Sequence, residues 1–346
     1  MKALVLEEDK KLRVDERPMP ERVTEDDILI RIAACGICGS DIPRGFENGA
    51  YHHPLVMGHE FSGTVAEQKP GSAFRPDDRV VIFPLIPTDK RDRAYATGDY
   101  AQCKEYDYFG SRRDGAFEEY LYVPEANLFK IPDHVNILHA AMTEPAAVAL
   151  HGVRKLHIRA GDSALVIGGG PIGNMTAQWL RIHGCDQVMV ADIDERKLAI
   201  AAEMGFTAIN SRATDLVEEV HRLTDGEGAP RVVEACGLPQ TFLQAIQGAA
   251  TFGEVVFMGN IHGEFTIGEK DFSSILRREL TIYGTWNSKV VPRGQDDWST
   301  VLRYMDRELI VAPLISDVVS LDEGPAVFDS VVHRKKFHNK VLFTLS

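Results

Sequence analysis

The middle of the chain alternates short apolar runs with helix-length segments of mixed polarity. The apolar runs are of strand length and lie at residues 164–167, 188–192, 208–210, 231–235, 254–258 and 280–284. Helical patterns separate them at about residues 172–183, 195–204 and 214–224, and another begins after Pro239. Alternation of this kind is typical of a parallel sheet with helices on both faces. We therefore predict a doubly wound α/β domain over residues 147–286.

The first 146 residues have a different pattern. Strand-like pieces such as residues 28–32 and 78–82 are short, flanked by polar residues and interrupted by Gly and Pro. Because no helical crossovers of regular length separate these pieces, an antiparallel, barrel-like β domain fits residues 1–146 best. Residues 287–346 lack enough apolar positions for a core of their own and end in a strand-like run. We expect them to return to the first domain.

Length and charge limit the class of protein. A chain of 346 residues with 44% hydrophobic and 26% charged residues can form two globular cores. The net charge of −13 argues against a nucleic-acid partner, although arginines in a pocket could still bind a phosphate. The N-terminal residues lack a basic leader, and no apolar run approaches the roughly 18–20 residues of a membrane span. We therefore expect a cytoplasmic protein with no membrane partner.

Three glycines mark a candidate dinucleotide site. Gly168, Gly170 and Gly173 follow a predicted strand, open a predicted helix and match the G-x-G-x-x-G fingerprint. Such a turn lets the backbone approach a pyrophosphate, which the N–H groups of the helix N-terminus then bind. A glycine-rich loop in another α/β fold is the structural alternative. The predicted cofactor-binding turn consists of Gly168, Gly170, Pro171, Ile172 and Gly173.

Asp192 lies at the end of the next predicted strand, nineteen residues after Gly173. A carboxylate at this place can accept hydrogen bonds from both ribose hydroxyls and would repel a 2′-phosphate, so NAD is favoured over NADP. Arg196 could pair with Asp192 or stack on the adenine. It could also tolerate the additional phosphate of NADP.

A second group of residues points to a metal. The five cysteines are too few and too scattered for a disulfide framework, so metal binding or burial is expected for them. Cys35 and Cys38 are separated by two residues, and His59-Glu60 and Glu144 follow later in the chain. A Cys-x-x-Cys pair alone could be packing or a redox pair. One thiolate, one imidazole and nearby carboxylates are what an open catalytic zinc site requires, although such ligands leave manganese or cobalt open.

The order and spacing of these motifs closely resemble the medium-chain zinc-dependent dehydrogenases along nearly the whole chain. The polyol branch, with sorbitol and threonine dehydrogenases, is the most similar. This resemblance implies a mixed α/β fold, in which a GroES-like β-barrel catalytic domain is joined to a Rossmann doubly wound parallel sheet. It also implies one catalytic Zn²⁺ per subunit, NAD as cofactor, and a homodimer or possible homotetramer.

The resemblance also implies roles for individual residues. Cys38, His59 and Glu144 would be metal ligands, with Glu60 as an alternating or neighbouring ligand that takes part in catalysis. Cys35 would only pack, and Ser40 would start a proton relay to solvent. Pro43 stands where many relatives have a histidine, so the far end of that relay is open, with His52 or His53 as substitutes only if folding brings them close.

Most relatives carry a second, structural zinc held by four cysteines. The matching positions in this chain are Asp89, Asp92, Tyr95 and Cys103. Because three of the four thiolates are missing, we predict that no structural zinc binds there.

Residues 108–120, together with residues 284–288 and 293–298, look most like galactitol-1-phosphate 5-dehydrogenases within the polyol branch. Arg112 and Arg113 could bind a substrate phosphate, or they could pair with Asp114, Glu118 or Glu119. We therefore predict zinc-dependent oxidation of a secondary alcohol of a polyol phosphate to a ketose phosphate, with hydride transfer to NAD. The alternative substrates are an unphosphorylated polyol, a diol or L-threonine. A zinc-free quinone reductase or a non-catalytic NAD-binding relative is disfavoured, because neither needs the proposed ligands.

Overall fold

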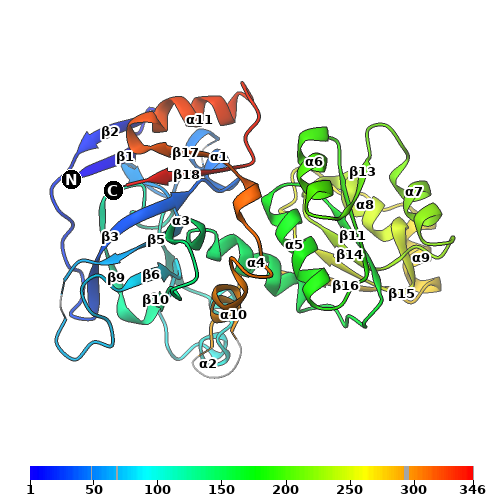
Figure 1. Ribbon diagram of the computed structural model, residues 1–346, viewed down its shortest axis with the longest axis horizontal. Coiled ribbons are helices and arrows are strands. Elements are labelled where there is room, and N and C mark those ends of the chain that lie inside the picture. Colours follow the sequence, from blue (N-terminus) through cyan, green and yellow to red (C-terminus); the bar gives the residue numbers. More distant parts are fainter. Residues whose placement is uncertain (48, 68, 292–295, 346) are drawn as a thin grey trace. The chain divides into compact units, whose positions relative to one another are not determined.

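The structure is a computed structural model that describes residues 1–47, 49–67, 69–291 and 296–345 (Figure 1). Its contacts divide it into two compact units. The first consists of Met1–Pro145 and Lys289–Ser346, and the second of Ala146–Ser288. The first unit is therefore built from two segments that are separated in sequence by the whole of the second.

The second unit is built on a parallel sheet, which confirms the prediction of a doubly wound fold. Among its described residues the strand order is β13 (Thr207–Asn210), β12 (Gln187–Asp192), β11 (Ser163–Ile167), β14 (Ala229–Glu234), β15 (Ala249–Phe257) and β16 (Thr281–Gly284). From β11 the chain builds outward to β13, then returns to β14 on the other side of β11 and builds outward to β16. The carboxyl ends of β11 and β14 meet at this reversal, which is where ligands bind in such sheets.

Helices cover both faces of this sheet (Figure 1). They are α5 (Pro171–Ile182), α6 (Glu195–Glu203), α7 (Leu216–Leu223), α8 (Pro239–Gly248) and α9 (Glu269–Arg277). Helices α5 and α6 pack on β11, β12 and β13, while α8 packs on β14 and β15 and contacts both α7 and α9. The sequence analysis did not identify α9, although Phe272, Ile275 and Leu276 have the i, i+3, i+4 spacing of a helix.

The first unit is dominated by antiparallel strands. In its described part the main sheet has the order β10 (Leu128–Lys130), β6 (Arg79–Ile82), β5 (Glu60–Val65), β3 (Asp27–Gly36), β18 (Lys340–Thr344) and β17 (Ile315–Ser320), and β9 (Tyr120–Pro124) also pairs with β3. Strands β17 and β18 are parallel to each other. A smaller sheet contains β2 (Leu12–Glu16), β1 (Lys2–Leu6) and β4 (Leu55–Val56), and β7 (Leu85–Pro87) pairs with β8 (Tyr106–Tyr108).

Short helices connect these strands. They are α1 (Asp41–Phe46), α2 (Arg93–Thr97), α3 (Ile137–Ala140), α10 (Asp297–Tyr304) and α11 (Gly324–Val332), with 3-10 turns η1 (Tyr100–Gln102), η2 (Glu125–Asn127), η3 (Ala312–Leu314) and η4 (Leu321–Glu323). Helix α4 (Thr143–Val153) begins in the first unit and continues into the second. None of the helices in the described ranges is both long and apolar enough to span a lipid bilayer.

The C-terminal segment supplies part of the core of the first unit. Strand β18 pairs with β3, and Phe343 lies opposite Cys35 in this register. The ring of Phe343 packs edge to face on Phe117 with ring centroids 5.1 Å apart. Both rings are fully buried, and burial of a phenylalanine contributes roughly 1.5–3 kcal/mol to stability.

Glu118 lies in this interior although it is acidic. Its side chain is 3% exposed and faces a cavity of about 410 Å³ that Arg17 and Asp114 also line. The structure shows no hydrogen bond to its carboxyl group within the described ranges. Burial, together with the charge of Asp114, raises the pKa of Glu118 from 4.5 to about 8. The folded protein therefore holds this carboxyl group protonated at neutral pH.

Glu118→Gln is expected to stabilise the protein at pH 9 and to have little effect at pH 4.5. In the wild type, Glu118 loses its proton at a lower pH in the unfolded chain than in the folded one. The free energy of unfolding therefore falls as the pH rises from 4.5 to about 8, by up to about 5 kcal/mol. Urea unfolding at both pH values measures the difference, with Glu21→Gln at the rim of the same cavity as control. The same change in stability at both pH values would contradict this account.

Candidate functional site

Strand pairing brings two of the predicted metal motifs together. Cys38 lies between β3 and α1, while His59 immediately precedes β5 and Glu60 is its first residue. Because β3 and β5 are antiparallel with Gly36 opposite Glu60, the end of one strand meets the start of the other. A Cβ atom on Gly36 would lie 2.2 Å from Oε2 of Glu60, so glycine leaves the space that this carboxylate occupies.

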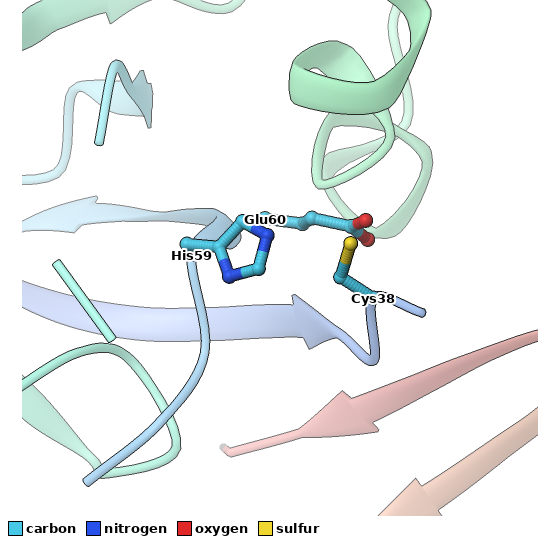
Figure 2. A group of neighbouring side chains, drawn as sticks. All are labelled: Cys38, His59 and Glu60. Atoms are coloured by element: carbon cyan, nitrogen blue, oxygen red, sulfur yellow. The ribbon is translucent and has the colours of Figure 1, made fainter. Parts of the chain in front are cut away.

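Three potential ligands converge at this point (Figure 2). One ligand atom from each of Cys38, His59 and Glu60 lies within 4.8 Å of the other two. His59 and Glu60 are buried and Cys38 is half-buried. A sulfur, an imidazole nitrogen and a carboxylate oxygen form the mixed donor set that suits Zn²⁺.

Glu60 is held by a lysine from the other end of the chain. Nζ of Lys340 donates to Oε1 and Oε2 of Glu60 at 2.9 and 2.7 Å, and also to the carbonyl oxygen of Ile37 at 2.9 Å. Lys340 is 4% exposed. The sequence analysis did not identify this residue, because a lysine at the start of a strand ordinarily faces solvent and only the β3–β18 pairing places it inside.

Asp41 is a second residue whose role was not predicted. Its carboxylate accepts hydrogen bonds from the backbone N–H of Cys38 and from Arg44, both at 2.9 Å. Its Oδ1 atom lies 3.6 Å from Nδ1 of His59. A carboxylate beside a metal-binding imidazole orients the ring and increases its basicity.

Glu144 lies beside the three-residue cluster rather than within it. It is buried in the first turn of α4 and accepts a hydrogen bond from the Tyr108 hydroxyl at 3.3 Å. Burial raises the pKa of Glu144 to about 7, which the charge of His59 opposes and that of Glu60 reinforces. The structure thus groups three of the four predicted ligands and places the fourth within electrostatic reach.

The residues present fit a divalent cation. Burial, and then the charges of Glu60 and Asp41, raise the pKa of the Cys38 thiol to about 12. Nδ1 of His59 is buried with no hydrogen-bond partner in the described part of the chain. A thiol, an unsatisfied imidazole and the Glu144 carboxylate, which has no ion-pair partner among the described contacts, are therefore close together, and a cation would interact favourably with all three. Ser40 is exposed at the edge of this group, where its hydroxyl donates to Sγ of Cys38 at 3.3 Å.

The predicted glycine turn has the geometry of a phosphate-binding loop. Gly168 follows β11 with φ +116°, a conformation that favours glycine. A Cβ on Gly173 would lie 1.7 Å from the carbonyl oxygen of Gly168, whereas one on Gly170 would meet open space. Gly170 is the N-cap of α5 and provides no side-chain cap. The first N–H groups of this helix are therefore available to a phosphate, with Pro171 and Ile172 in its first turn.

Asp192 closes the turn, but Arg196 does not pair with it. The Asp192 carboxylate accepts hydrogen bonds from the N–H groups of Gly169 and Asp194 at 2.7 and 2.9 Å. Arg196 donates instead to Asp194, at 2.9 and 2.6 Å. Of the interactions that the sequence left open for Arg196, the pair with Asp192 is not among the described contacts, because Asp194 caps α6 directly beside the guanidinium. Lys197, which the sequence analysis did not name, lies 3.6 Å from Asp192.

The four positions of the structural zinc site have other interactions. Asp92 caps α2 and accepts from the backbone of Ala94 and Lys104, and Tyr95 stacks on Tyr100 at 5.3 Å. Asp89 pairs with Arg91 at 2.9 Å, but both side chains are well exposed and the pair contributes little stability. Cys103 is buried, and burial raises the pKa of its thiol.

We expect chelator-washed protein to retain one tightly bound zinc per chain. Elemental analysis against protein concentration measures this number. Two zinc ions per chain would contradict the prediction, as would the loss of one zinc on Cys103→Ala.

The two arginines proposed for phosphate binding have different surroundings. The Arg112 guanidinium lies over the rings of Tyr106 and Tyr51, at 4.4 and 5.1 Å. Arg113 lies 3.4 Å from Asp107 and packs over Phe109. Neither pairs with Asp114, Glu118 or Glu119 in the described contacts, so the alternative partners that the sequence suggested are wrong. Arg112 is linked by contacts to a neighbour of the metal cluster, because the ring of Tyr106 packs against Tyr108.

Known proteins match both parts of the chain. Residues 24–133 match the alcohol dehydrogenase GroES-like domain, and residues 171–307 match the zinc-binding dehydrogenase family. Galactitol 1-phosphate 5-dehydrogenase of Escherichia coli (strain K12) is 34% identical over 346 residues, with 99% of each chain covered. Sorbitol dehydrogenase of Bacillus subtilis (strain 168) is 30% identical over 99% of this chain and 96% of its own.

Solved structures are similar over the same length. The crystal structure of galactitol-1-phosphate dehydrogenase from Escherichia coli has a TM-score of 0.91 at 33% identity, and 99% of this chain and 100% of that chain are covered. A structure from Sinorhizobium meliloti 1021, solved with bound NADP, has a TM-score of 0.89 at 31% identity, with 99% and 98% covered.

The chain therefore belongs to the zinc-binding medium-chain dehydrogenases and is an oxidoreductase of the polyol dehydrogenase type. The predicted fold, with a GroES-like domain and a Rossmann domain, is confirmed.

Proposed function

We propose that this protein oxidises a secondary alcohol of a polyol phosphate similar to galactitol 1-phosphate, giving a ketose phosphate and reducing NAD. The observation that carries the proposal is the convergence of Cys38, His59 and Glu60 in one buried group. Glu144 is proposed as the further ligand, with Glu60 alternating with it. A protein without a metal would have no use for this enclosed set of acidic groups. We further propose a homodimer, with a homotetramer as the alternative.

The reaction removes a proton from the hydroxyl oxygen of the alcohol and a hydride from its carbon. A zinc ion held by these residues would supply Lewis acidity, which lowers the pKa of a coordinated water from 15.7 to about 7 and would act on a hydroxyl in the same way. Ser40 is the proposed first proton acceptor, because it is exposed and its hydroxyl lies 3.3 Å from Sγ of Cys38. Lys340 holds Glu60 in place, and the Asp41 carboxylate lies beside His59.

NAD is the proposed hydride acceptor. Asp192 would receive the adenine ribose hydroxyls on the lone pairs that the two backbone N–H groups leave open. Arg196 remains a proposed contact with the adenine, because it lies in the first turn of α6, the helix that follows Asp192. Because a related structure contains NADP, the preference of this protein for NAD or NADP has to be measured. Lys197, 3.6 Å from Asp192, is the cation that could accommodate a 2′-phosphate.

The phosphate preference is proposed to depend on Arg112. Its guanidinium is held against Tyr106, whose ring packs on Tyr108, and Tyr108 contacts Glu144. Arg113 is balanced by Asp107 and faces the cavity around Glu118, so it is the weaker of the two candidates. The Arg112 guanidinium already lies over the rings of Tyr106 and Tyr51, so it has partners without a phosphate. These contacts favour the alternative function, a dehydrogenase of an unphosphorylated polyol such as sorbitol.

NAD reduction by paired polyols tests this proposal. Arg112→Ala is expected to raise KM for galactitol 1-phosphate about ten- to hundredfold, because a charge-assisted hydrogen bond contributes roughly 1.5–3 kcal/mol. KM for galactitol should change little. Arg113→Ala serves as the matched control. Equal effects on both substrates would contradict phosphate recognition by Arg112, and turnover that survives zinc removal would contradict the metal-dependent reaction.

A further inference from the structure

Tyr108 contacts two of the proposed metal ligands. Its hydroxyl donates to Oε1 of Glu144 at 3.3 Å, and its ring packs edge to face on His59 with ring centroids 5.7 Å apart. We propose that Tyr108 is a positioning residue of the metal centre, which holds Glu144 so that its other carboxylate oxygen is directed to the cation. This inference rests on the proposed zinc site.

The backbone around Tyr108 is rigidly held. Tyr108 pairs with Leu85 across the β7–β8 ladder. Its carbonyl oxygen accepts hydrogen bonds from the N–H groups of Ser111, Arg112 and Arg113 in the turn that follows. The phenol therefore projects from a fixed base, and a fixed donor restricts the rotamer of the carboxylate that it contacts.

The two glutamates of the site are held by different kinds of donor. Both oxygens of Glu60 accept from the Lys340 ammonium, so its negative charge is already balanced. Glu144 accepts from a neutral phenol on one oxygen, and the described residues offer it no cation within ion-pair distance. A neutral donor orients a carboxylate without cancelling its charge. One oxygen of Glu144 is therefore held by a single neutral donor, and Tyr108 sets the direction of the other oxygen.

Zinc affinity of the purified protein tests this inference without any substrate. Tyr108→Phe removes one oxygen atom and keeps the ring on His59. Competition with a chelator is expected to show zinc binding weakened about ten- to hundredfold, the usual cost of losing a partner of a metal ligand. The visible spectrum of the cobalt-substituted variant should differ from that of the wild type, while the unfolding temperature of the metal-free protein should stay the same.

Tyr106→Phe is the matched control, because Tyr106 lies on the same short strand and packs on Tyr108 without contacting Glu144. It should bind zinc as the wild type does, whereas Glu144→Gln should bind zinc at least as weakly as Tyr108→Phe. If Tyr108→Phe keeps wild-type zinc affinity and cobalt spectrum, or if Glu144→Gln does, the inference is overturned and the proposed function stands. A wild-type protein that binds no zinc overturns the proposed function and this inference with it.

Discussion

Cys38→Ser is expected to abolish zinc binding and dehydrogenase activity together. The thiolate is the only soft donor in the group that Cys38, His59 and Glu60 form, and a serine hydroxyl is a poor ligand for zinc in a structural or catalytic site. Without the Lewis acid, the substrate hydroxyl keeps a pKa far above neutral, so kcat/KM should fall by about 10³-fold or more. Metal analysis and NAD reduction by galactitol 1-phosphate measure both effects.

Cys35→Ala is the control for this variant, because it tests which cysteine of the Cys-x-x-Cys pair binds the metal. Cys35 is fully buried on β3, and its Sγ contacts the carbonyl oxygen of Gly36 at 3.9 Å. Its replacement should reduce stability and leave one zinc per chain. Loss of zinc from Cys35→Ala, with zinc kept by Cys38→Ser, would reverse the assignment.

Asp192→Ala is expected to change the cofactor preference. The variant should lose about ten- to hundredfold in kcat/KM with NAD, because it removes charge-assisted hydrogen bonds to the ribose, each of roughly 1.5–3 kcal/mol. The substitution also removes the negative charge that repels a 2′-phosphate. In the wild type Lys197 lies 3.6 Å from the Asp192 carboxylate, and the variant leaves Lys197 without this partner. Activity with NADP should therefore rise relative to NAD.

Initial rates with both cofactors measure this ratio. The control is Glu203→Gln, an exposed position at the end of α6, the helix that carries Lys197. The Asp192 carboxylate also holds the backbone of Gly169 and Asp194, so thermal unfolding should be measured on the same samples. An unchanged NAD to NADP ratio in a variant that stays folded would contradict the assignment of Asp192 to the ribose.

The sequence predicted those parts of the structure that depend on local pattern. The alternation of apolar runs and helical segments predicted the parallel sheet, because a strand buried on both faces is apolar throughout. The G-x-G-x-x-G turn was also predicted from local pattern, because its three glycines lie within six residues of one another. Helix α9 was missed although Phe272, Ile275 and Leu276 have helical spacing.

The parts that the sequence did not predict depend on contacts between distant residues. Lys340 and Glu60 are 280 residues apart, and only the pairing of β18 with β3 brings them together. Tyr108 and Glu144 are 36 residues apart and lie on different elements. Pairing with Asp192 was one of the interactions left open for Arg196, but its guanidinium pairs with the capping residue Asp194. In each case the partner of a polar side chain is set by the folded structure and cannot be read from the spacing of residues along the sequence.

The Lys340–Glu60 pair has a consequence for how the protein is made. A ribosome releases Glu60 long before Lys340, so the nascent chain holds this glutamate without its cation while the whole second unit is synthesised. Burying an unpaired carboxylate is costly, and chain segments separated this far pair slowly. The pocket for the metal is therefore expected to close only after β18 has left the ribosome. Zinc loading would then be one of the last events in maturation rather than an early template for folding.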